Sequence, residues 1–134
     1  MRSILLLALA LAFLPVRADI GEGNWDLQIT TVIPGVPPNA IRQSQCLSAA
    51  DAKDPAKLLG NPGQGCAFGN RSDSGSVFHF EITCEREGSA LSGSGELRYT
   101  RDAIDGDIVM RVKQGEQTLE VRTAVKAKRV GPCR

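Results

Sequence analysis

Four cysteines are the residues with the clearest chemical potential in this sequence: Cys46, Cys66, Cys84 and Cys133. A zinc site favours closely spaced C-x-x-C pairs, often joined by histidine, and a redox-active site also usually has C-x-x-C. Here the cysteines are far apart and the chain has a single histidine. We therefore predict structural disulfides, with no metal site and no cofactor.

The spacing of the central two cysteines predicts that they pair with each other. A hairpin that turns at residues 72–76 places Cys66 opposite Cys84 and Asn70 opposite Phe80. Directly opposed strand positions bring Cβ atoms to within about 4.5 to 5.5 Å, close to what a disulfide requires. We predict the disulfide Cys66–Cys84.

The outer two cysteines, Cys46 and Cys133, then pair by elimination, which is one of three possible connectivities for four cysteines. This second disulfide would hold the end of the chain against a strand near residue 46.

His79 is the one candidate for general acid–base chemistry, but no serine elbow of the G-x-S-x-G type accompanies it. Alternation places it on the face opposite Phe78 and Phe80, where we expect an exposed strand residue. The segment 60–65, GNPGQG, lacks the Lys-Ser/Thr ending of a phosphate-binding loop. We predict no catalytic residue and no enzyme activity.

Asp102, Asp105 and Asp107 lie close together and could in principle hold calcium, but their spacing does not match an EF-hand loop. We interpret them as turn residues. The one basic cluster, Lys126, Lys128, Arg129 and terminal Arg134, alternates with apolar residues. We interpret it as a solvated strand face that could contact an anionic surface.

A proline-stiffened apolar loop is the candidate partner contact. Its residues are Val32, Ile33, Pro34, Gly35, Val36, Pro37 and Pro38. Such a loop loses little conformational entropy on binding. The alternative is that it packs against its own sheet.

The elements that position these residues begin after an N-terminal segment typical of export. Arg2 precedes an apolar run, residues 4–14, and Val16-Arg17-Ala18 fits the cleavage rule. The run is too short to span a membrane. We expect a signal peptide over 1–18, a single disulfide-linked β-rich domain over 19–134, no transmembrane anchor, and a periplasmic or secreted location.

The charge of the expected mature chain argues against nucleic-acid partners. Removing residues 1–18 takes away two of 16 basic residues and none of 15 acidic ones, so the formal net charge changes from +1 to −1. A near-neutral chain has no long-range attraction for nucleic acid or anionic membrane.

Strand signals dominate the mature chain. Period-two alternation predicts strands at residues 25–33, about 40–46, 77–85, 91–101, 107–113 and 118–130, with turns at 86–89, 102–106 and 114–117. Such short connections join antiparallel neighbours. Residues 48–60 combine a Ser48 cap and a Gly60 stop, which predicts a short helix interrupted near Pro55.

Each strand carries one apolar and one charged face, so the sheet must bury its apolar face. We predict a mainly β fold: an antiparallel meander sheet, curled or barrel-like, with one short helix and two disulfides. The apolar face could instead be covered by the N-terminal strands and the short helix folding across it.

Several motifs resemble a family of small exported bacterial proteins classed as domain of unknown function 3617. They are Gly23-Asn24-Trp25, Pro34-Gly35-Val36-Pro37, Gln45-Cys46-Leu47-Ser48, the pair Cys66 and Cys84, and Arg129-Val130-Gly131-Pro132-Cys133. The resemblance covers essentially the whole mature chain. It implies a periplasmic β-rich domain with two disulfides, and it brings no known activity or catalytic residues.

These observations favour a non-enzymatic, monomeric binding or structural module of the cell envelope, with an envelope protein as its partner. The alternative is an inhibitor of an exported hydrolase that presents a rigid loop.

Overall fold

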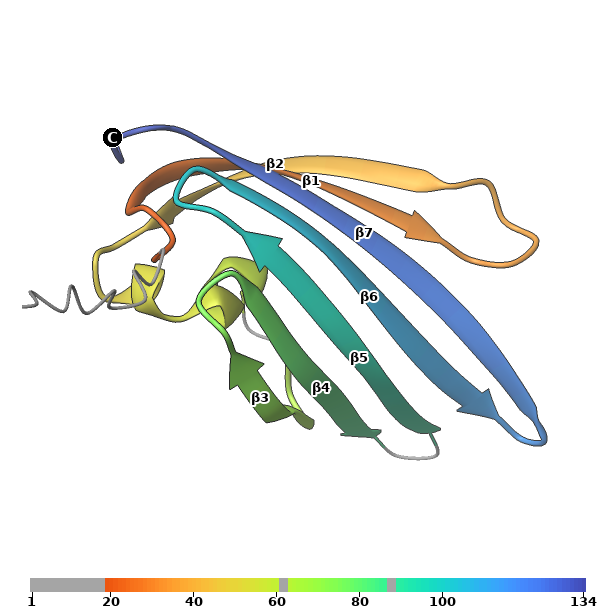
Figure 1. Cartoon of the computed structure of the whole chain (residues 1–134). Coiled ribbons are helices and arrows are strands. Elements are labelled where there is room, and N and C mark those ends of the chain that lie inside the picture. Colours follow the sequence, from red (N-terminus) through yellow and green to blue (C-terminus); the bar gives the residue numbers. More distant parts are fainter. Residues whose placement is uncertain (1–18, 61–62, 87–88) are drawn as a thin grey trace, which may run out of the picture.

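The computed structural model describes residues 19–60, 63–86 and 89–134, so the expected signal peptide lies outside the described residues. The described chain forms one seven-stranded antiparallel sheet in the order β2-β1-β7-β6-β5-β4-β3 (Figure 1). The strands are β1 (Gly23–Val32), β2 (Asn39–Leu47), β3 (Cys66–Asp73), β4 (Val77–Arg86), β5 (Ser89–Tyr99), β6 (Ala103–Gln114) and β7 (Gln117–Gly131).

The predicted antiparallel meander is confirmed, because β3 to β7 are neighbours in chain order. The sheet is not closed into a barrel. The N-terminal hairpin of β1 and β2 does not fold across the apolar face; β1 pairs with β7 and extends the sheet, which leaves β2 and β3 as the two edges. The long connection from β2 to β3 covers one end of one face (Figure 1).

The predicted short helix, interrupted near Pro55, is present as two 3-10 turns, η1 (Asp51–Lys53) and η2 (Pro55–Leu59). Asp54 between them is extended, as expected for a residue before proline, which is biased away from the helical region. Its carboxylate accepts a hydrogen bond from the Ala56 amide at 3.1 Å. The Ser48 hydroxyl accepts a hydrogen bond from the Asp51 amide at 3.1 Å, although the N-cap residue of η1 is Ala50, which makes no side-chain cap.

The core lies where η2 covers the sheet, and we call this side of the sheet the inner face. Trp25, Leu58 and Leu97 are completely buried there. The indole nitrogen of Trp25 donates a hydrogen bond to the Gly21 carbonyl at 2.9 Å, which satisfies its polar group. The rings of Phe78 and Phe80 stack with their centroids 5.6 Å apart.

Both disulfides have the predicted pairing, Cys46–Cys133 and Cys66–Cys84. Cys66 and Cys84 are directly opposed in the β3–β4 register. The predicted pairing of Asn70 with Phe80 is wrong, because the register shifts between Gly69 and Ser72. Asn70 has a φ of 45°, a left-handed conformation that asparagine tolerates better than most residues, and this bulge absorbs the shift.

The predicted turn at 102–106 is also wrong. The β5–β6 turn is at residues 100–102, with the Thr100 amide donating to the Ala103 carbonyl at 2.9 Å, and β6 begins at Ala103. Ile104 is buried and lies opposite Ala127 of β7, so packing on the inner face extends the strand through a stretch rich in turn-forming residues.

Candidate functional site

The inner face continues beyond η2 as an incompletely covered apolar surface. Two hollows lie on it, one of about 250 Å³ bounded by Leu58 and Leu59 of η2, the other of about 300 Å³ reaching Ser89 at the start of β5. Ile82 and Met110 line both hollows, so the hollows adjoin. We call the two hollows together the trough; its half-buried lining comprises Ile29, Phe68, Ile82, Leu91, Ile108, Met110, Val112 and Thr123.

Strand register explains why these side chains share one face. Met110 of β6 lies opposite Val121 of β7 and Gly93 of β5, and Ile82 of β4 also lies opposite Gly93. Opposed residues in a ladder point to the same side of the sheet. The alternating apolar positions predicted along each strand therefore combine into one continuous surface.

Two glycines of β5 shape the floor of the trough. A Cβ atom at Gly95 would overlap the ring of Phe80, and one at Gly93 would overlap the sulfur of Met110. Each larger side chain therefore lies across the strand in the space that its glycine neighbour leaves free. Glycine in a strand commonly marks such a close approach.

The lining of the trough is uncharged among the described residues, and its polar side chains are Gln43, Thr123 and Ser89. The surface therefore offers dispersion contacts and apolar burial to a ligand, together with very few hydrogen-bonding groups.

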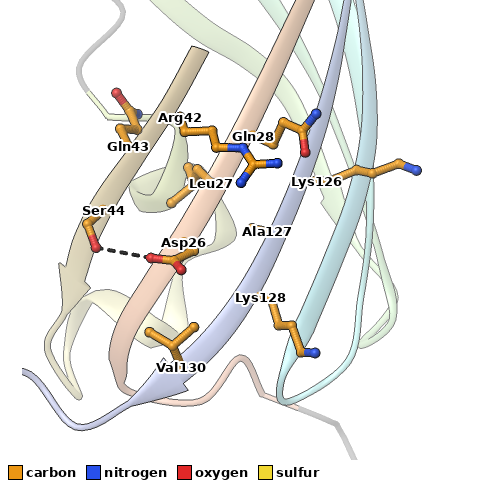
Figure 2. Close-up of a pocket in the computed structure, with 10 residues that line it drawn as sticks. All are labelled: Asp26, Leu27, Gln28, Arg42, Gln43, Ser44, Lys126, Ala127, Lys128 and Val130. Atoms are coloured by element: carbon orange, nitrogen blue, oxygen red, sulfur yellow. Dashed lines mark hydrogen bonds between the residues drawn. The ribbon is translucent and has the colours of Figure 1, made fainter. Parts of the chain in front are cut away.

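A different hollow, of about 550 Å³, lies on the outer face over β2, β1 and β7. In Figure 2, Arg42 reaches across β1 while Lys126 and Lys128 project from β7. Asp26 is the one acid in the lining and accepts a hydrogen bond from Ser44 at 3.2 Å. This hollow is basic, and its charged side chains are exposed.

The structure divides the basic cluster predicted from the sequence. Arg129 does not line this hollow. Its Nε donates to the Glu22 carbonyl at 2.5 Å, and its Nη1 lies 3.9 Å from Asp102. Arg42 takes its place, since Gln28 of β1 lies between Arg42 and Lys126 in the register. Only strand pairing brings Arg42 here, so no local sequence signal could have found it.

His79 lies on the outer face as predicted, with 54% of its side chain exposed. Its Nδ1 is 3.5 Å from a carboxylate oxygen of Glu96, the residue opposite it in β5. Ser94 lines the same shallow hollow but lies opposite Glu81. His79 therefore lies between Glu96 of β5 and Ser72 of β3 in the register, and its ionic contact is with the Glu96 carboxylate.

Each of the three aspartates lies near an arginine: Asp105 and Asp107 near Arg98 on the outer face, and Asp102 of the β5–β6 turn near Arg129. Arg98 binds Asp107 at 2.9 Å and Glu96 at 3.0 Å, and lies 3.5 Å from Asp105. Hydrogen bonds to Asp107 and then to Glu96 raise the pKa of the Arg98 guanidinium. Among the described residues, no group of three or more histidines, cysteines or acids could hold a metal ion.

The apolar loop at residues 32–38 joins β1 to β2 and projects at the end of this hairpin (Figure 1). Val32 and Val36 are 43% and 54% exposed, so neither is packed against the sheet. The Val36 amide donates to the Ile33 carbonyl at 3.1 Å, and Gly35 has the positive φ that the turn requires.

The fold and the trough define a disulfide-linked, open antiparallel sheet protein with an apolar inner face. The chain matches the family described as Protein of unknown function (DUF3617) over residues 20–133, and it belongs to this family. Comparisons with curated proteins and with solved structures found no significant match. No helix among the described residues is long and apolar enough to cross a membrane.

Proposed function

We propose that this protein is a non-enzymatic binding module of the cell envelope that holds an apolar ligand in the trough. The trough carries the proposal, because its apolar side chains remain half-exposed on the same face as the core. Contiguous apolar surface of this kind marks ligand or partner sites. Each Å² that a ligand removes from water contributes about 25 cal/mol.

The chemistry of the cysteines supports an exported location. Two disulfides are typical of proteins that work in oxidising compartments such as the periplasm. Residues 1–18 have the composition of a signal peptide. A periplasmic protein has access to the apolar components of the envelope.

The surroundings of the ionisable residues favour binding over catalysis. His79 is half-exposed and faces Glu96, and Arg98 forms ion pairs with Glu96, Asp105 and Asp107. Catalytic groups usually lie in clefts, where burial and neighbouring charges tune their pKa values. The trough, by contrast, offers no ionisable side chain among the described residues.

Binding of N-phenyl-1-naphthylamine, whose fluorescence rises in apolar surroundings, tests this function. We expect the oxidised mature protein to bind the probe. Thr123→Trp should fill the first hollow and weaken binding at least tenfold. Ala124→Trp is the matched control, since the next residue of β7 points to the outer face, is exposed, and should leave binding unchanged.

Circular dichroism must show that both tryptophan variants remain folded. Equal probe binding by the two folded variants, or no binding by the unsubstituted protein, would contradict a ligand site in the trough.

Inhibition of an exported hydrolase is the second candidate function, and the exposed, turn-constrained loop at 32–38 favours it. An inhibitor should abolish the activity of its target at a near-stoichiometric dose. Val36→Asp should relieve this inhibition, because Val36 is the most exposed large apolar side chain in the part of the chain that the structure describes. Titration of exported hydrolases with both proteins measures the effect, and inhibition unaffected by Val36→Asp would remove the loop as the contact.

A further inference from the structure

We propose that the ligand of the trough is a long-chain fatty acid, whose single unbranched chain lies lengthwise through both hollows. This inference rests on the proposed binding function and adds the chemical class of the ligand. Shape, charge and hydrogen-bonding capacity of the trough each support it.

The two hollows adjoin on the inner face. The first is bounded by Leu58 and Leu59 of η2, the second extends to Ser89, and Ile82 and Met110 lie between them. A single flexible chain can extend from the first hollow past these two residues into the second.

The absence of charged side chains from the described lining excludes recognition through ion pairs within the trough. The basic hollow in Figure 2 lies on the opposite face of the sheet and cannot contribute. A hydrocarbon chain suits such an uncharged lining, because it brings no charge that must be paired when water is removed.

Hydrogen-bonding capacity separates an acyl chain from a peptide. A buried peptide segment brings an N–H and a C=O at nearly every residue, and each needs a partner. The lining offers the side chains of Gln43, Thr123 and Ser89 to a ligand, too few for an extended segment. An acyl chain has no such requirement.

Burial sets the direction of the bound chain. Leu58, at the η2 end, is completely buried, whereas Ser89 is exposed. A carboxylate buried without a partner is strongly unfavourable. The methyl end therefore points toward η2, and the carboxylate reaches water near Ser89.

Met110 is placed to connect the two hollows. Its sulfur lies over Gly93, and its side chain lines both hollows. Methionine is unbranched and flexible, so it can change rotamer and adapt to a chain passing between them.

Displacement of the naphthylamine probe by saturated fatty acids of increasing length tests the proposal, at concentrations below micelle formation. We expect the affinity of the oxidised mature protein to rise with each methylene by up to about fourfold, the value for a fully buried CH₂. The rise should stop once the chain fills both hollows.

Leu91→Trp should block the second hollow, so that affinity stops rising at a shorter chain length while short chains bind as before. Ser92→Trp is the matched control, because this neighbouring residue of β5 is exposed on the outer face. Val112→Trp tests the same hollow from β6 if Leu91→Trp fails to fold.

Two results would contradict a fatty acid as the ligand without contradicting the proposed binding function. In the first, the protein binds the probe, but its affinity for fatty acids does not depend on their chain length. In the second, the protein is a dimer in solution and Leu91→Trp converts it to a monomer, which would place a second copy of the chain on the trough. Absence of binding by both probe and fatty acids would instead overturn the proposed function itself.

Discussion

At the residue scale, glycines on the inner face are as important as the apolar side chains. Gly95 of β5 lies opposite Phe80 of β4, and the ring of Phe80 occupies the space above it. Phe80 is almost fully buried and also packs edge-on against Phe68 at 5.4 Å. The missing side chain at Gly95 is therefore what lets two aromatic rings fit between the sheet and η2.

This arrangement predicts that Gly95→Ala destabilises the fold. The new methyl group would overlap the ring of Phe80, and overpacking of a core typically costs about 1 to 3 kcal/mol. Urea unfolding of the oxidised protein measures the change in the free energy of unfolding.

Gly69→Ala is the matched control. A Cβ atom at Gly69 of β3 meets no other atom within 4 Å, and its φ is not in the left-handed region. We expect its free energy of unfolding to change by at most about 1 kcal/mol. Equal losses in both variants would show that strand glycines matter here for a reason other than the position of Phe80.

At the element scale, each edge strand is held by one disulfide. Cys46 of β2 is bound to Cys133, which follows β7, and Cys66 of β3 is bound to Cys84 of β4. An edge strand has a neighbour on one side only and is more easily lost or mispaired than a central strand. The disulfides thus reinforce the two elements that the ladder holds least firmly.

Removing the outer disulfide should therefore cost stability and loosen β2. The double variant Cys46→Ser with Cys133→Ser opens a connection between residues 87 apart, worth between about 4 and 5 kcal/mol in the chain-entropy model. Urea unfolding measures this loss, and hydrogen exchange should show faster exchange of the β2 amides.

The inner disulfide provides the comparison. It joins residues 18 apart, so Cys66→Ser with Cys84→Ser should cost about 3 kcal/mol and loosen β3 instead. Unchanged exchange in β2 after loss of the outer disulfide would contradict its role in holding that edge.

The strands and the two disulfides were predictable from the sequence, but some details were not. Alternation identifies the strands because one face of each is buried. The same rule missed the bulge at Asn70 and the true start of β6 at Ala103, since these depend on which neighbours the strands pack against. Pro55 predicted an interruption, although not that both pieces would be 3-10 turns.

At the scale of the whole molecule, the segment that covers the inner face, η2 with the chain around it, is shorter than the sheet. η2 and the chain around it bury Trp25 and Leu97, while Leu91 and Val112 near the other end of the inner face remain half-exposed. The incomplete cover creates the trough, so the probe-binding and fatty-acid predictions both follow from the overall arrangement of sheet and cover.

The strands, their apolar faces, the disulfide pairing and the family can be inferred from the sequence, because they follow from local alternation, spacing and short motifs. Three features are visible only in the folded chain: β1 joins β7, Arg42 lies near Lys126, and Met110 lies between two adjoining hollows. These features depend on contacts between distant segments. Alternation specifies which face of a strand is apolar, but not which strand lies beside it or how much of that face is covered.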